Sequence, residues 1–350
     1  MLNNLTALYI LVILNIIISF LFLIIKFAQN AIIAYSAITY CKILKFIGLF
    51  FTFPFLIIIG IIGKDYLYGQ LIKNEFIYAR YDVKITSSFL QELIDPYQRL
   101  SIYTLLLFSL FISLMMLIYH HYKVNALYAK IDRSSTYPLS LFKLLKQVKQ
   151  QLNIHAKIDI CRSSYIQKPC LLQLEYPTII IPNHQYSEKQ LINLIEHELY
   201  HFKQHDLFYI KLANFFKIIY WYNPIVIAYA NTLLFSCELA IDEKMTSDMS
   251  KQDKLDLIKL MNYCLKNLPS SQQFNVISFS DHKKHNIVKR VEFIINFKRH
   301  QRYRLICTAL LSLTIILAPL ASYQLTKTIF ELLPSKVTFE EIIDVNDFTL

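Results

Sequence analysis

The sequence predicts a polytopic α-helical membrane protein with four transmembrane helices and one folded α+β domain between the third and the fourth. Three observations predict it. The chain of 350 residues is 55% hydrophobic and only 17% charged, which is too apolar for an ordinary soluble domain. Four stretches are almost continuously hydrophobic over about 20 residues, the length that crosses a bilayer. Only the block between the last two stretches is long enough and polar enough to form a folded domain.

The predicted spans are residues 5–25, 46–62, 102–118 and 305–323. The first could be a secretory signal, but no basic region precedes it and no small-residue cleavage site follows. We therefore expect a true span there, and a membrane region with three spans over residues 1–121.

Lysine and arginine, which accumulate on the cytoplasmic side of membranes, set the orientation. The loop 26–45 and the block 122–304 are rich in these residues and are expected to be cytoplasmic. The loop 64–101 mixes both signs evenly and the tail 324–350 is acidic, so both are expected outside, as are the two termini.

The net charge of +11 has its explanation in this layout. The basic residues flank the predicted spans, where they contact anionic lipid headgroups. Because no nucleic-acid-binding pattern is present, we expect membrane lipid as a partner and no direct contact with nucleic acid.

The block 122–304 shows a helical pattern first, then short strands, then more helices. Residues 137–154 have helical spacing, 156–161 alternate like a strand, and 171–182 give two short strand-like pieces. Pro177 and Pro182 bound the second piece and favour an edge position for it. Further helices are expected at 187–206, where Ser187 can cap, and at 207–220, 224–249, 252–267 and 284–298.

The helix predicted at 187–206 carries a metal-site pattern. His197-Glu198-Leu199-Tyr200-His201 is H-E-x-x-H, and residues four apart share one face of a helix, so two imidazoles can converge on one ion. Glu198 then projects beside the metal, where it can take a proton from water. The alternative is a solvated helix with His and Glu on its polar face.

A hydrolytic zinc site needs a third protein ligand. Glu238 and Asp242 lie four residues apart further along the chain, so Glu238 can bind zinc while Asp242 holds the second nitrogen of a ligand histidine. His205 is the rival third ligand, but three histidines spaced four apart span about 12 Å of one straight helix, too far for one ion. Two imidazoles and a carboxylate favour zinc.

These motifs occur in an order that resembles a known family. "PTIIIP" precedes "HELYHFKQHD", and "YWYNPIV", "CELAIDE" and "NIVKRVEFII" follow. The set is similar to the antirepressor membrane zinc metallopeptidases, which include the beta-lactam and methicillin-resistance sensor-transducers of bacteria. The resemblance implies a gluzincin-type domain with one Zn²⁺ per chain in the bacterial cytoplasmic membrane. It implies His197, His201 and Glu238 as metal ligands, Glu198 as catalytic base and Asp242 in support.

The chain departs from the family pattern in two places. Ile241 stands where the family usually has Cys, at a position that is not a ligand. Only 27 residues follow Tyr323, so we expect this chain to lack the C-terminal penicillin-binding sensor domain.

The resemblance further implies a regulatory peptidase that cleaves a cytoplasmic repressor, such as a winged-helix protein, or itself within residues 270–286. A substrate strand would add beside 178–181. Partners are then a protein or peptide substrate and a second copy of the chain in a homodimer. The alternatives are a housekeeping protease that degrades membrane proteins, an intramembrane protease and a catalytically silent scaffold. The charges of the 187–206 helix argue against a site within hydrocarbon, and the intact motif argues against a silent scaffold.

Overall fold

The computed structural model describes residues 18–52, 96–266 (without 167, 174 and 175), 284–297, 309 and 312. The chain divides into two compact units, one made of residues 19–49 and 110–314, the other of residues 1–18, 50–109 and 315–350. Only residues 18, 50–52 and 96–109 of the second unit are described. Predicted span 46–62 lies mostly outside the described residues, as do nearly all of span 305–323 and the first part of span 5–25.

The N-terminal helices belong to the same unit as the predicted domain, which the boundary at residue 121 did not anticipate. After the helical segment Ile18–Phe27 come α2 (Gln29–Tyr35) and α3 (Ala37–Phe50). The start of α3 is held by a residue that lies 205 positions further along the chain than Ile38. Glu243 accepts hydrogen bonds from the Ser36 hydroxyl at 3.0 Å and from the Ile38 amide at 3.0 Å.

Predicted span 102–118 is part of one long helix, α5 (Pro96–Ser134). Within the larger unit, its large apolar side chains are exposed, as they would be on a helix that faces lipid: Leu110, Phe111, Leu114, Met115, Met116 and Ile118.

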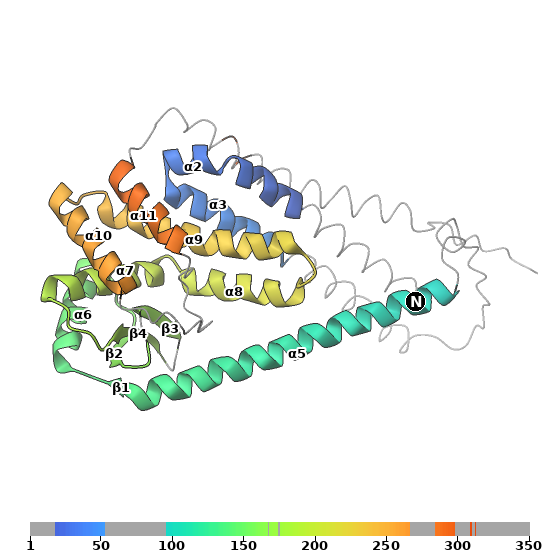
Figure 1. Ribbon diagram of the computed structural model, residues 1–350, viewed down its shortest axis with the longest axis horizontal. Helices are drawn as coiled ribbons and strands as arrows, with labels where there is room; N and C mark the ends of the chain where they lie inside the picture. The colour runs from blue at the N-terminus through green and yellow to red at the C-terminus, as the bar shows by residue number, and fades with distance from the viewer. Residues whose placement is uncertain are drawn as a thin grey trace, which may run out of the picture. The chain divides into compact units, whose positions relative to one another are not determined.

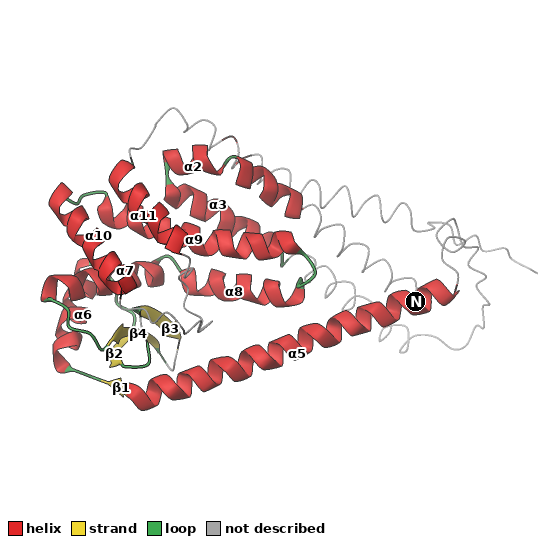
Figure 2. Cartoon of the chain, in the orientation of Figure 1, coloured by secondary structure: helices red, strands yellow, loops and turns green. Residues whose placement is uncertain are grey.

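The domain contains a small mixed sheet. β2 (Asp159–Ser163) pairs antiparallel with β1 (Ser135–Thr136) and parallel with β4 (Pro177–Pro182), and β3 (Cys170–Gln173) pairs antiparallel with β4. The strand order is therefore β1-β2-β4-β3. Figure 2 shows β2, β3 and β4 next to α7, and β1 at the end of α5.

The predicted edge position of residues 177–182 is wrong. β4 is paired on both sides, and β3 forms the edge of the sheet among the described residues. Ile179 and Ile181 pack on one face and Ile180 on the other, and a strand buried on both faces is a continuous apolar run. Pro177 and Pro182 are tolerated because they are the first and last residues of the strand.

Helices cover both faces of the sheet (Figure 1). On one face α6 (Leu139–Gln151) and α7 (Glu188–Lys203) pack against β2, β3 and β4 through a cluster of buried leucines and isoleucines. On the other face, Leu127 and Ile131 of α5 pack against Cys161, Leu172 and Ile180. The core thus fixes α7 to the sheet along its whole apolar stripe.

The C-terminal half of the domain is helical, close to the predicted ranges. It comprises α8 (Asp206–Ile219), α9 (Pro224–Thr246), α10 (Lys251–Lys266) and α11 (Lys284–Asn296). A third cluster, with Ile241, Met245, Leu257 and Ile294, joins α9, α10 and α11.

Among the described residues, α9 is the single unbroken helix that passes a length-and-composition test for a membrane span. More than half of its apolar window is buried inside the protein, as in the core helix of a domain. The segment Ile18–Phe27 with α2, bent by 62°, would be a second candidate if the pair forms one span.

Candidate metal centre

The H-E-x-x-H pentad lies in the last two turns of α7. Ser187 caps this helix as predicted, in a capping box. Its hydroxyl accepts from the Gln190 amide at 3.3 Å, and the Gln190 side chain accepts from the Ser187 amide at 2.9 Å. The His197 and His201 rings lie on one face, with centroids 5.0 Å apart.

Glu238, from the middle of α9, meets these two histidines. One carboxylate oxygen lies 3.4 Å from His197 Nε2 and the other lies 3.6 Å from His201 Nε2. The three residues offer donor atoms that all lie within 4.8 Å of one another. Residues 41 positions apart in the sequence are thus brought into one cluster, as the H-E-x-x-H plus Glu pattern predicts.

The cluster fits a zinc ion. Zinc binds nitrogen and oxygen at about 2.0–2.2 Å in a tetrahedron, which puts neighbouring ligand atoms about 3.3–3.6 Å apart. The two histidine–carboxylate distances match that spacing. The charge of the site also favours a cation. Burial disfavours a charged His201 ring, but its hydrogen bonds with Asp206 and Glu238 outweigh burial and raise the pKa of His201 well above its ordinary value.

Asp206 orients His201. One carboxylate oxygen lies 2.7 Å from His201 Nδ1, and Asp206 is only 1% exposed. A ligand histidine held in this way keeps its other nitrogen directed at the metal. Burial raises the pKa of the Asp206 carboxyl, but the hydrogen bond to His201 and the charge of Lys45 lower it by more. The pKa of Asp206 therefore lies below its ordinary value.

The expected role of Asp242 therefore does not match the geometry. Both of its carboxylate oxygens accept hydrogen bonds from Arg290 of α11, each at 2.7 Å. The same guanidinium reaches Glu238 through Nη1 at 2.6 Å. Asp242 therefore holds Arg290 and not a histidine ring. Arg290 in turn fixes Glu238 and ties α11 to α9.

His205 is not part of the cluster. α7 ends at Lys203, and His205 is an exposed residue with φ 57° in the turn before α8. The helix therefore ends before His205 can lie on the same face as His197 and His201.

Glu198 is buried beside the two histidines and is 6% exposed. Burial raises the pKa of Glu198, and the neighbouring His201 and His197 and a hydrogen bond to the Leu171 backbone only partly offset this. A carboxylate with a raised pKa beside a metal site can accept a proton and release it again, as a general base must.

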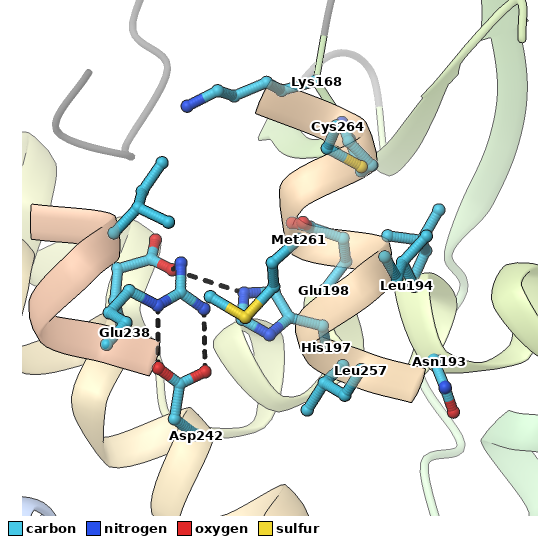
Figure 3. Close-up of a pocket in the computed structure, with 14 residues that line it drawn as sticks. Lys168, Asn193, Leu194, His197, Glu198, Glu238, Asp242, Leu257, Met261 and Cys264 are labelled. Carbon is cyan, nitrogen blue, oxygen red and sulfur yellow. Dashed lines mark hydrogen bonds and ion pairs between the residues drawn. The ribbon is translucent and has the colours of Figure 1, made fainter. Parts of the chain in front are cut away.

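A cavity of about 110 Å³ opens onto this cluster. Figure 3 shows His197 and Glu198 on one side of it and Glu238 with Asp242 on another. Leu194 of α7 and Leu257 and Met261 of α10 form an apolar part of the wall. The arrangement joins a metal-ligand set, a buried carboxylate and room for a small group.

Sequence reasoning missed the roles of Asp206 and Arg290. Asp206 follows the pentad by five residues, in a turn whose geometry the helical pattern does not reveal. Arg290 lies 48 residues beyond Asp242, in a segment whose basic character is equally typical of a membrane boundary. The sequence did offer Asp206 as a candidate, because the second nitrogen of a ligand histidine commonly bonds a carboxylate and Asp206 is an acidic residue close to the pentad.

Comparison with known proteins agrees with the geometry. Residues 77–294 match the family model described as BlaR1 peptidase M56. Regulatory protein BlaR1 of Bacillus licheniformis is 26% identical over 165 residues, covering 45% of this chain and 27% of that relative. The methicillin resistance mecR1 protein of Staphylococcus aureus strain Mu50 is 26% identical over 247 residues, covering 65% of this chain and 40% of that relative. The aligned part thus spans less than half the length of either relative. Because the family model covers more than half of the sequence, the chain belongs to the BlaR1 peptidase M56 family of metallopeptidases.

Proposed function

We propose that this protein is a membrane-embedded zinc metalloendopeptidase with a cytoplasmic active site that acts in regulation. One observation carries the proposal: His197, His201 and Glu238 converge from α7 and α9, with the buried Glu198 at the same cavity. Membership of a metallopeptidase family supports it.

Each residue has a distinct task in peptide hydrolysis. His197, His201 and Glu238 would hold the ion, and Arg290 and Asp206 would keep two of these ligands in place. Zinc, when bound, supplies a Lewis acid that activates water and polarises the scissile carbonyl. Glu198 takes the proton of the attacking water and passes it to the leaving amine, so the carboxylate is regenerated as the peptide bond breaks.

The substrate would bind along β3. The predicted position beside 178–181 is not open to a substrate, because β2 and β3 already occupy the two sides of β4. β3 is an edge strand among the described residues, and Leu171 within it hydrogen-bonds to Glu198 through its backbone. A peptide added to this edge would pass the catalytic carboxylate.

The proposed substrates are a cytoplasmic repressor of the winged-helix class and the chain itself. The similarity to a regulatory protein and to a methicillin resistance protein supports a regulatory role. Self-cleavage is proposed for 270–286, which lies mostly outside the described residues. This stretch joins α10 to α11, and both helices line the cavity through Cys264, Ile287 and Arg290.

We place the protein in the bacterial cytoplasmic membrane with four spans and both termini outside. The exposed apolar side chains of α5 over 110–118 support a lipid contact there. Cysteine labelling from either side of the membrane, at 64–101 and in the peptidase domain, tests the orientation.

The functional test compares the wild-type chain with Glu198→Gln, each co-expressed with candidate winged-helix repressors from the same organism. We expect repressor fragments, and a fragment of the chain itself, only with the wild type. Fragments that persist with Glu198→Gln would show that another protease makes them. Cleavage of unrelated membrane proteins instead of the repressor would favour a housekeeping protease.

A further inference from the structure

Lys45 is a buried cation from α3 that reaches the metal centre from the N-terminal part of the chain. It is only 7% exposed, whereas Lys42, one turn earlier on the same helix, is exposed. The Lys45 ammonium forms an ion pair with Asp206 and donates a hydrogen bond to the Gln204 carbonyl at 2.9 Å. It also lies 5.2 Å from the centre of the Tyr209 ring.

These contacts join α3 to the end of α7 and to the first residue of α8. Asp206 uses one carboxylate oxygen for Lys45 and the other for His201 Nδ1. Gln204 is the C-terminal capping residue of α7, the helix that carries both histidines. A single ammonium therefore touches the residue that orients His201 and the end of the helix on which His201 stands.

We propose that Lys45 is a positioning residue for the metal centre, so that the docking of α3 onto the peptidase domain sets the affinity for zinc. The inference rests on the proposed function, because it assumes that His201 is a zinc ligand. The last residues of α3 overlap predicted span 46–62, and Lys45 directly precedes that span in the sequence.

The physical reason is the pairing of charges at a buried site. Asp206 is almost fully buried, and a buried carboxylate is costly unless it is paired. The bond to a histidine ring leaves the second carboxylate oxygen to Lys45. Without the ammonium this oxygen loses its cation, and the carboxylate no longer holds one orientation toward His201.

A rival explanation is a second metal site, because Cys41, Cys237 and Asp206 also offer donor atoms within 4.8 Å of one another. Lys45 argues against it, since its positive charge already pairs with Asp206 and would repel a divalent ion. The two sulfur atoms, 3.6 Å apart, pack α3 against α9 at the position just before Glu238. This packing keeps Lys45 beside the site.

The test is zinc affinity of the full-length chain in detergent, measured by competition with a chromophoric chelator. We expect Lys45→Met to bind zinc about 10–100-fold more weakly, the usual effect of losing an outer partner of a ligand. Lys42→Met is the matched control and should bind as the wild type does. Lys45→Arg keeps the charge and should recover most of the affinity.

The double variant Lys45→Met/Asp206→Asn separates positioning from general stability. If Lys45 acts through Asp206, its removal adds little once Asp206 has become neutral, so the double variant should match Asp206→Asn alone. The double variant also lacks an unpaired buried charge, so it should fold even if Lys45→Met does not.

Three results would overturn the inference. They are wild-type zinc affinity in Lys45→Met, losses from Lys45→Met and Asp206→Asn that simply add, and a double variant that still fails to fold. A wild-type chain that binds no zinc would instead refute the proposed function on which the inference rests.

Discussion

The ion pairs that Arg290 forms with the two acidic residues of α9 should be costly to break. Its guanidinium is 13% exposed and makes two bonds to Asp242 and one to Glu238. Asp242 is 1% exposed and the Glu238 side chain 8%. Replacing Arg290 with Met keeps much of the volume but leaves two buried carboxylates without their cation.

The expected size follows from this burial. Removing one partner of a buried ion pair costs about 3–5 kcal/mol. For a domain of roughly 150–250 residues, each kcal/mol lowers the midpoint of thermal unfolding by about 2–4 °C, so Arg290→Met should lower it by about 6–20 °C. One of the three bonds goes to Glu238, which zinc would also neutralise, so zinc should offset only about a third of the loss.

Thermal unfolding in detergent, with zinc and with a chelator, measures both effects. Lys289→Met is the matched control, because Lys289 is the exposed neighbour of Arg290 on α11. A midpoint for Arg290→Met within a few degrees of the control would refute this reasoning. So would full restoration by zinc, because Asp242 would then need no partner.

Further variants test the remaining parts of the site. Glu198→Gln should keep zinc and lose about 10²–10⁴-fold in peptide cleavage, and equal activity in a cleavage assay would exclude Glu198 as the base. Burial raises the pKa of Glu198, so the folded chain binds this proton more tightly than the unfolded chain. The stability of the zinc-free protein should therefore fall as pH rises through that raised pKa, and denaturation at several pH values should show a flatter profile for Glu198→Gln. His205→Ala should bind zinc normally while His201→Ala does not, and equal losses in metal analysis would bring His205 into the site. Ser187→Ala should cost about 1 kcal/mol of stability by chemical denaturation, and a smaller change than about 0.3 kcal/mol would mean that the capping box is unimportant.

The local features were predictable because they depend on neighbours in sequence. H-E-x-x-H puts both histidines on one face of any helix that contains it, and the cap at Ser187 needs only Gln190. The helices of the domain also began and ended close to the expected residues, since their apolar residues repeat at helical spacing.

The order of the strands was not predictable from the same evidence. Pro177 and Pro182 favour an edge position by pattern alone, but a proline at either end of a central strand breaks no hydrogen bond in the middle of its ladder. The unbroken run of isoleucine between them was the better signal, since it indicates burial on both faces.

The supporting carboxylate was misassigned for a related reason. Asp242 and Asp206 are both plausible partners for a histidine by spacing alone, and the choice depends on Arg290 and Lys45. Those partners lie 48 and 161 residues away in the chain, so only the folded arrangement brings them to the site. The N-terminal helices were likewise assigned to the membrane region, although Ser36, Cys41 and Lys45 contact the peptidase domain.

Zinc content per chain, measured by elemental analysis of the wild type and of Glu238→Ala purified side by side, is the most direct test of the metal centre. We expect one zinc per wild-type chain and a strong loss of zinc from the variant, because two histidines alone hold the ion weakly. A wild type without zinc, or a variant that retains one zinc per chain, would contradict the assignment of His197, His201 and Glu238 as its ligands.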